Sequence, residues 1–323
     1  MDPIAAHGLT LRRPTLADVD DVVALYNLHD RLEFGVDDTD ATELLDAWRQ
    51  QDMARDLWLL ADPAGALIGS IEVHHRRGVH VELWVLVHPD WRRRGIGSRL
   101  AEIGEARAAE LLERAPEGTR VTLEGWVNAR SDGARAFAAG RGYVATRTFW
   151  RMRIDLGEEP PAEPAWPEGL RVRTFDPSRD ALATWKAAEE AFADHWGHVP
   201  VSFAEWSRRT EGDLFDPELW FLAVDEASDE IAGTSLCSRY LDLGWVGTLA
   251  VRRQWRGRGL GEALLRHSFA AFHRDGRRTV ALGVDADSLT GATRLYERAG
   301  MRVDRAHELW TKVLREGRVL EEA

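Results

Sequence analysis

One residue pattern that suits phosphate chemistry occurs twice in the chain. The two copies are Arg256-Gly257-Arg258-Gly259-Leu260-Gly261-Glu262 and Arg92-Arg93-Arg94-Gly95-Ile96-Gly97-Ser98, and 256 minus 92 sets them 164 positions apart. Glycines have no Cβ, so the backbone can approach a ligand closely. The first N–H groups of a following helix are unpaired and carry the positive end of its dipole. Each copy therefore predicts a phosphate or pyrophosphate site.

Each copy stands between two predicted elements. An apolar, strand-like run precedes each one, from Trp245 to Val251 and from Val79 to Val87. After the second copy, Leu265, Phe269 and Phe272 recur at the i, i+4, i+7 spacing of a helix. The predicted unit is therefore a strand, a glycine-rich turn and a helix.

The pattern differs from the common nucleotide-binding motifs. It has no Gly-Lys-Ser/Thr, and Gly259-Leu260-Gly261 lacks the third glycine of a dinucleotide turn. It resembles the pyrophosphate loop of the GNAT acyltransferases, Gln/Arg-x-x-Gly-x-Gly/Ala. The alternative is a glycine turn in an arginine-rich chain, since Lys186 and Lys312 are the only lysines. Two copies, each between strand and helix, favour the family.

Length and composition narrow the classes of protein. A chain of 323 residues favours two domains, and 44% apolar residues are ample for packed cores. The net charge of −12 argues against nucleic acid or an anionic membrane as a general partner. Cys237 is the only cysteine, so no internal disulfide forms, as suits a reducing cytosol. No apolar run approaches the ~18 residues of a membrane span, and a cytoplasmic protein is expected.

The predicted elements repeat in the same order in both halves. The first half gives strands at 9–12, 57–61, 67–75, 79–87, 121–127 and 143–154, and helices at 16–28, 41–50, 96–114 and 132–140. The second gives strands at 170–173, 219–224, 231–240, 244–251, 280–284 and 301–313, and helices at 179–193, 202–210, 260–275 and 292–298. The order β-α-α-β-β-β-α-β-α-β, found twice, is similar to that of the GNAT fold.

The resemblance implies a fold class and a division into domains. The expected fold is α/β (α+β), with two tandem GNAT domains, each a mixed, mostly antiparallel central sheet flanked by helices. Residues 157–169 are rich in proline and predict a linker. The expected domains are residues 1–156, non-catalytic but with a loop suited to acetyl-CoA, and residues 170–323, catalytic.

The resemblance also assigns an acyl-binding strand to each half. In GNAT enzymes, backbone N–H groups of the strand before the loop polarise the thioester carbonyl, which stabilises the charge that develops on its oxygen. The positions that match are Leu249, Ala250 and Val251 in the second half and Val85, Leu86 and Val87 in the first. An ordinary sheet strand is the alternative. With the two loops, these residues form the predicted acetyl-CoA site.

A tyrosine on the last helix is the expected general acid. GNAT enzymes commonly show Ala-x-x-Leu-Tyr-Glu-x-x-Gly-Phe there, and the second half reads Ala292-Thr293-Arg294-Leu295-Tyr296-Glu297-Arg298-Ala299-Gly300-Met301. Tyr296 therefore matches the catalytic position, whereas the first half has Ala138 there. The alternative is that Tyr296 only packs against its neighbours.

The general base and the acceptor site are left open by the residues. Glu82 lies on a central strand of the first half and matches Val246 by a constant count. Asp194, His195 and Trp196 lie between two early helices of the second half, in the segment that lines the acceptor site of GNAT folds, and Asp285 follows the fifth strand. A polar helix end with solvated histidines is an equally good interpretation. His195 and His198, without a third ligand, predict no metal site.

The resemblance implies an acetyl-CoA-dependent N-acetyltransferase. Acetyl would pass directly to a primary amine of a small molecule in a ternary complex, because no nucleophile stands out. The alternatives are an acyl-CoA-binding regulatory or scaffold protein without turnover, and a protein N-acetyltransferase. Two similar halves in one chain further predict a monomer, with the domains paired as in a dimer.

Overall fold

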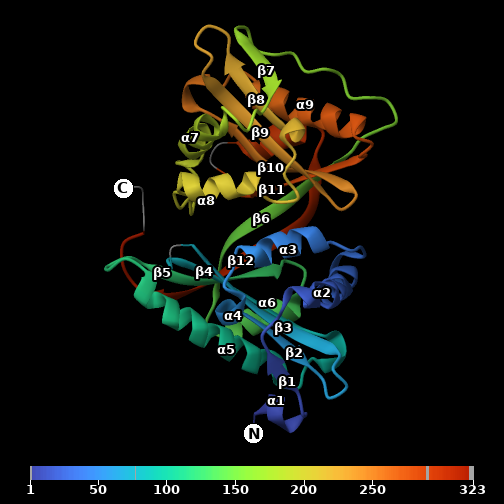
Figure 1. Ribbon diagram of the computed structural model, residues 1–323, viewed down its shortest axis with the longest axis vertical. Helices are drawn as coiled ribbons and strands as arrows, with labels where there is room; N and C mark the ends of the chain where they lie inside the picture. The colour runs from blue at the N-terminus through green and yellow to red at the C-terminus, as the bar shows by residue number, and fades with distance from the viewer. Residues whose placement is uncertain (1, 77, 289–290, 320–323) are drawn as a thin grey trace. The chain divides into compact units, whose positions relative to one another are not determined.

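The computed structural model describes residues 2–76, 78–288 and 291–319 (Figure 1). Contacts within the chain divide it into two compact units. Among the described residues, unit 1 consists of 2–147 and 307–319, and unit 2 of 148–306. The two units repeat one arrangement of strands and helices, and each is described by itself.

Unit 1 is a mixed, mostly antiparallel sheet with helices on both faces. Its strands lie in the order β1 (Thr10–Arg12), β2 (Leu57–Ala61), β3 (Leu67–Arg76), β4 (His80–Val87), β5 (Val121–Asn128) and β12 (Arg302–Arg315), and only β4 and β5 pair in parallel. Its helices are α1 (Pro3–Ala6), α2 (Val19–Phe34), α3 (Ala41–Arg49), α4 (Met53–Asp56), α5 (Ile96–Leu111) and α6 (Asp132–Gly140).

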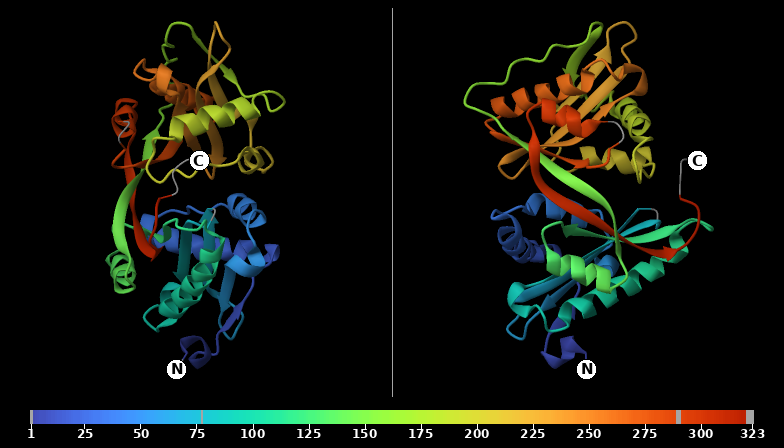
Figure 2. Two further views of the ribbon diagram at one scale, coloured as in Figure 1. Left: turned by 90° about the vertical axis from the view of Figure 1, so that its left-hand side faces the viewer. Right: turned by 180° about the vertical axis from the view of Figure 1, so that it is seen from behind.

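Neighbouring residues of β3 show which helices cover which face of this sheet. Ile71 lies against Gly104 of α5, whereas the next residue, Glu72, accepts hydrogen bonds from Tyr26 of α2 and Trp48 of α3. Successive side chains of a strand point to opposite faces. Helix α5 therefore covers one face, and α2 and α3 cover the other (Figure 2).

Unit 2 repeats this plan. Its strands lie in the order β6 (Val144–Asp155), β11 (Thr279–Asp285), β10 (Leu243–Val251), β9 (Ile231–Tyr240), β8 (Trp220–Asp225) and β7 (Leu170–Thr174), with β10 and β11 as the parallel pair. Its helices are α7 (Ala181–Phe192), α8 (Phe203–Ser207), α9 (Leu260–Arg274) and α10 (Ala292–Arg298). The α/β class and the mixed sheet predicted from the sequence are confirmed.

The last strand of each sequence half pairs with the fifth strand of the other half. His307–Arg315 of β12 pairs with β5, and Phe149–Asp155 of β6 pairs with β11. Each unit is therefore completed by a strand from the opposite half of the sequence (Figure 1).

The proline-rich segment at residues 157–169 contains neither helix nor strand, as predicted. Contacts place it within unit 2, since they divide the chain at 147/148 and at 306/307. The boundary at 157–169 stays a prediction about the two halves of the sequence. Among the described residues, no helix is both long and apolar enough to span a membrane.

Candidate active site

The glycine-rich loop of unit 2 turns sharply from strand β10 into helix α9. Gly257 and Gly259 have φ of 76° and 82°, a left-handed conformation that glycine adopts without a steric penalty. Gly259 caps α9, which begins at Leu260. A Cβ on Gly261 would lie 3.0 Å from Leu295 Cδ1 and 3.6 Å from Val251 Cγ2. Glycine at this position therefore allows the loop, the end of β10 and helix α10 to meet.

Two arginines of this loop differ in their contacts. Arg256 donates hydrogen bonds to the carbonyl oxygens of Val251 (3.0 Å) and Ala191 (2.9 Å), and to the Asp194 carboxylate (3.2 Å). Arg256 thus fixes the loop to β10 and α7. Arg258 is exposed and forms no ion pair with any residue that the structure describes. It is the loop cation left available for an anion.

Strand β10 separates from β11 before it reaches the loop. The parallel pairing covers Gly244 and Trp245, and the described part of the chain has no β10–β11 pairs beyond them. The backbone groups of Val246–Val251 that face away from β9 therefore have no strand partner. Of the three residues predicted for carbonyl polarisation, Leu249 and Val251 direct their N–H groups to this separated edge. Ala250 alternates with them and faces β9, as does the Arg252 N–H that donates to Ala232 O.

A β-bulge in β10 is a feature that the sequence interpretation missed. The register against β9 shifts between Val246 and Thr248, which leaves Gly247 as the extra residue. A bulge bends its strand and increases the local twist. A glycine inside a strand pattern is the signal that indicates it.

The bulge also corrects the match between Glu82 and Val246. Glu82 pairs with His74 on β3, and Trp245 pairs with Ser238 on β9. Since β3 and β9 correspond without a gap, Trp245 is the counterpart of Glu82. The constant spacing of 164 residues therefore gives a match that is wrong by one residue for the part of β10 that precedes the bulge.

Tyr296 lies on α10, next to the residue that contacts the loop. Its side chain is 8% exposed, and burial raises the pKa of its phenol to about 12. Its hydroxyl has no hydrogen-bond partner within the described chain. The phenol therefore keeps its proton to a higher pH than an ordinary tyrosine does.

The segment between α7 and α8 brings a histidine close to the loop. Although His195 as a residue is exposed, its ring lies 4.4 Å from that of Phe192. Burial of the ring, followed by the charge of Arg256, lowers the pKa of His195, with Asp194 and Asp285 opposing the shift. His195 is therefore predominantly neutral at neutral pH and can accept a proton.

The other predicted acceptor-site residues have different surroundings. The carboxylate of Asp194 binds the guanidinium groups of Arg253 and Arg256, and this holds its pKa below the ordinary range. Trp196 is 48% exposed. Asp285 ends β11 and accepts a hydrogen bond from the Asp287 N–H (3.0 Å). Asp194 thus supports the loop, whereas Trp196 and Asp285 remain the candidates for acceptor contacts. The described residues form no group of three side chains suited to a metal ion.

The loop of unit 1 follows the same path with different side chains. Arg93 adopts φ of 64° where unit 2 has Gly257, and a left-handed conformation costs a residue with a Cβ roughly 1–2 kcal/mol. Arg92 lies 2.9 Å from His29 Nδ1, and the guanidinium of Arg94 stacks 4.7 Å from the Trp91 ring. Pro3 of helix α1 lies 3.8 Å from the Cβ position of Gly95. Helix α1 thus lies beside the loop of unit 1, while residues 92–95 of that loop remain exposed.

Unit 1 lacks two features of the unit 2 site. The Tyr143 N–H donates to Ala138 O (3.1 Å), just as the Met301 N–H donates to Tyr296 O (3.0 Å), so Ala138 and Tyr296 are equivalent positions. Strand β4, whose last residues are Val85, Leu86 and Val87, pairs with β3 without a bulge.

Comparisons with known proteins agree with this geometry. The model of the acetyltransferase (GNAT) family matches residues 22–143 and 181–301. The mycothiol acetyltransferase of Thermobispora bispora is 34% identical over 67% of this chain and 70% of its own length. That of Streptomyces griseus is 34% identical over 77% of each chain.

Two solved structures share the arrangement. A GCN5-related N-acetyltransferase from Sphaerobacter thermophilus matches with a TM-score of 0.86 and 36% identity, covering 100% of this chain and 99% of that one. A tandem GNAT protein from the clavulanic acid biosynthesis pathway gives a TM-score of 0.72 at 21% identity, covering 96% and 99%, and so supports the fold alone. The chain therefore belongs to the acetyltransferase (GNAT) family and is an N-acetyltransferase with two such domains in tandem.

Proposed function

We propose that unit 2 transfers an acetyl group from acetyl-CoA directly to a primary amine of a small molecule. The observation that carries this proposal is the position of Tyr296. It is a buried, protonated phenol that directly follows Leu295, the residue packed against the loop at Gly261. Unit 1 has Ala138 at the equivalent position and would not catalyse transfer.

The loop residues fit the pyrophosphate of acetyl-CoA. Gly257, Gly259 and Gly261 keep side chains away from the turn, and the N–H groups at the start of α9 face the same region. Arg258 supplies an unpaired positive charge. Leu249 and Val251 would direct backbone N–H groups at the thioester oxygen, where developing negative charge needs donors.

The chemistry requires one bond to form and one to break. Acetyl-CoA supplies the acetyl group as an activated thioester, and the amine nitrogen bonds to the acetyl carbon while the carbon–sulfur bond breaks. His195, neutral because its pKa is lowered, would accept the proton that the amine loses. Tyr296 would donate its proton to the departing sulfur. Both residues would then return to their initial state by exchange with water.

The acceptor is proposed to be a small amine. Relatives named mycothiol acetyltransferases support a small-molecule acceptor. In unit 2, the exposed Trp196 offers an apolar surface and Asp285 a carboxylate for a cationic amine. These two residues would select the acceptor rather than perform the chemistry.

The direct test is release of the CoA thiol with acetyl-CoA and a panel of primary amines. We expect turnover with at least one small amine and a matching N-acetylated product by mass spectrometry. Binding of acetyl-CoA without thiol release across the panel would instead support a scaffold protein. Turnover restricted to peptide amines would support a protein acetyltransferase.

A further inference from the structure

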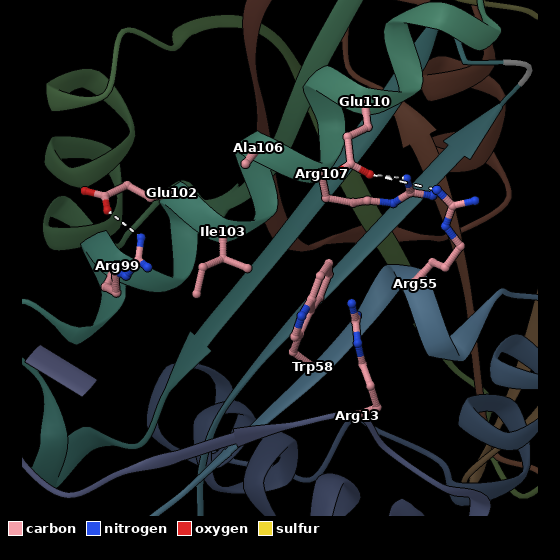
Figure 3. Close-up of a pocket in the computed structure, with 9 residues that line it drawn as sticks. All are labelled: Arg13, Arg55, Trp58, Arg99, Glu102, Ile103, Ala106, Arg107 and Glu110. Carbon is pink, nitrogen blue, oxygen red and sulfur yellow. Dashed lines mark hydrogen bonds and ion pairs between the residues drawn. The ribbon is translucent and has the colours of Figure 1, made fainter. Parts of the chain in front are cut away.

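A pocket of about 340 Å³ lies in unit 1 between helix α5 and the start of strand β2 (Figure 3). It is lined by Arg13, Arg55, Trp58, Arg99, Glu102, Ile103, Ala106, Arg107 and Glu110. The α5 residues recur every three to four positions and so form one stripe of the helix. None of the loop residues 92–98 lines this pocket. Its volume is in the range of small-molecule sites, roughly 300–1,000 Å³.

The pocket combines an apolar wall with an unpaired cation. Trp58, Ile103 and Ala106 supply the wall. The guanidinium of Arg13 lies 3.8 Å from the Trp58 ring centre, and its Nη1 donates to Leu57 O (2.8 Å). Among the described residues, no carboxylate pairs with Arg13. The remaining N–H groups of Arg13 are therefore available to an anion beside an aromatic surface (Figure 3).

A second, buried arginine has a donor without a partner. The Arg107 side chain is only 5% exposed. Its Nε donates to Asp56 (2.7 Å) and its Nη1 to Glu110 (2.7 Å), but its Nη2 is buried without a hydrogen-bond partner in the described structure. A buried donor left unsatisfied costs roughly 1–3 kcal/mol.

Unit 2 fills the equivalent place with its own chain. Leu60 pairs with Gly69 and Ala223 with Gly233, so Trp58 and Phe221, two positions earlier, correspond. The ring of His267 on α9 lies 4.7 Å from Phe221 and 5.7 Å from Trp166 of the proline-rich segment. Trp166 thus packs where unit 1 has open volume.

Arg13 and Arg107 have no basic counterparts in unit 2, although Arg274 stands there at the position of Glu110. The positions of Arg13 and Arg107 are occupied there by Thr174 and Ala271. Open volume, an unpaired cation and an unsatisfied buried donor therefore occur together in unit 1, whereas unit 2 places an indole ring there. The equivalent space in unit 2 accommodates the indole ring of Trp166, so an aromatic ring suits the shape of the unit 1 pocket. In unit 1, Arg13 supplies a positive charge that would bind an anion.

We propose that this pocket of unit 1 binds a small aromatic monocarboxylate, with its ring against Trp58, Ile103 and Ala106 and its carboxylate on Arg13. A single negative charge fits because the other lining arginines already pair with carboxylates: Arg55 with Glu110, and Arg99 with Glu102. Glu102 and Glu110 disfavour a dianion such as a phosphate monoester.

The experiment is isothermal titration calorimetry of the full chain, with indole-3-acetate and with neutral indole-3-acetamide as the two ligands. Saturating acetyl-CoA is present so that the loops are occupied. We expect saturable binding of the acid, at least about tenfold tighter than that of the amide, because a charge-assisted hydrogen bond is lost with the charge. Equal affinity for the two compounds, or no saturable binding of the acid, overturns the proposal.

Two variants locate the binding. Arg13→Gln removes the unpaired charge and should weaken the binding of indole-3-acetate at least about fivefold. The affinity for indole-3-acetamide should not change. Arg31→Gln is the control, since Arg31 is an exposed arginine on α2 that pairs with Asp37 outside the pocket. Equal affinity of the wild-type protein and Arg13→Gln for the acid contradicts the assignment. The acid–amide comparison in the wild-type protein needs no variant and stands even if one fails to fold.

Discussion

The two units share one plan, but they differ where the chemistry would occur. Strand β4 of unit 1 pairs regularly with β3, whereas β10 of unit 2 has the extra residue Gly247. Ala138 in unit 1 occupies the position of Tyr296 in unit 2. Both differences concern the proposed acyl-transfer region, although both loops are retained. A duplicated loop is thus no evidence for a duplicated reaction.

The two units also differ in the charge of one sheet face. In unit 1 this face lies toward α2 and α3 and has acidic residues, which the matching face of unit 2 lacks. Unit 1 has Glu72, Glu82 and Glu124, and the strand registers place Leu236, Trp245 and Ala281 at the matching positions of unit 2. The unit 1 carboxylates are fixed internally: Glu72 accepts hydrogen bonds from Tyr26 (2.7 Å) and Trp48 (3.3 Å). Carboxylates held in this way would contribute to the structure of unit 1 rather than to proton transfer.

The largest expected difference comes from an aspartate in each loop. Gly259→Asp adds a side chain at φ of 82° and a negative charge beside the proposed pyrophosphate site. Like charges placed together cost several kcal/mol, so kcat/KM for acetyl-CoA should fall at least about a hundredfold. Gly95→Asp, with φ of 77° in unit 1, is the matched control and should keep kcat/KM within about threefold. Comparable losses in the two variants would mean that both loops support turnover.

A smaller difference is expected from a single methyl group. Gly261→Ala places a Cβ 3.0 Å from Leu295 Cδ1, which should displace α10 and lower kcat/KM about three- to tenfold. In Gly97→Ala the new Cβ lies 3.7 Å from Val87 Cγ2, which is an ordinary van der Waals contact, so kcat/KM should not change. The measurement is kcat/KM of both variants by steady-state kinetics. Melting curves check that both variants fold. An unchanged kcat/KM for Gly261→Ala would show that α10 need not be held there.

The smallest expected effect is that of pH. The Tyr296 pKa is raised to about 12, so the protonated donor persists to higher pH than in an ordinary tyrosine. The lowered pKa of His195 leaves the base neutral over the same range. We expect kcat to stay within about twofold between about pH 8 and about pH 10. A midpoint of activity loss inside that interval would show that the proton donor is a group with a lower pKa.

Local pattern predicted most of the fold. The apolar runs, the glycine turns and the helical spacing of Leu265, Phe269 and Phe272 indicated the strand–loop–helix units that the structure contains. The loop was predicted from its glycines and its place between a strand and a helix, whereas Tyr296 was predicted only through the resemblance to the GNAT family, and both assignments stay predictions. The structure adds the contact at Gly261 that brings them near each other.

Pairing between distant segments could not be predicted in the same way. The run that forms β12 has the same local pattern whether it pairs with β5 or with β11, so the exchange of last strands leaves no local signal. The Gly247 bulge could not be predicted from the repeat, because the spacing of 164 residues was taken from the two loops. That spacing contains no information about an extra residue earlier in β10. The Asp194 contacts with Arg253 and Arg256 depend on a loop conformation that the sequence does not specify.

The most direct test of the central claim, that transfer occurs in unit 2, is kcat for Tyr296→Phe beside Tyr143→Phe. Both tyrosines are 8% exposed, and each substitution removes a hydroxyl while keeping the ring. General acid catalysis contributes about a hundred- to ten-thousand-fold, so kcat of Tyr296→Phe should fall at least about tenfold even if water substitutes in part. Tyr143→Phe should retain wild-type kcat. Full kcat in Tyr296→Phe, or an equal loss in Tyr143→Phe, would contradict the assignment of the reaction to unit 2.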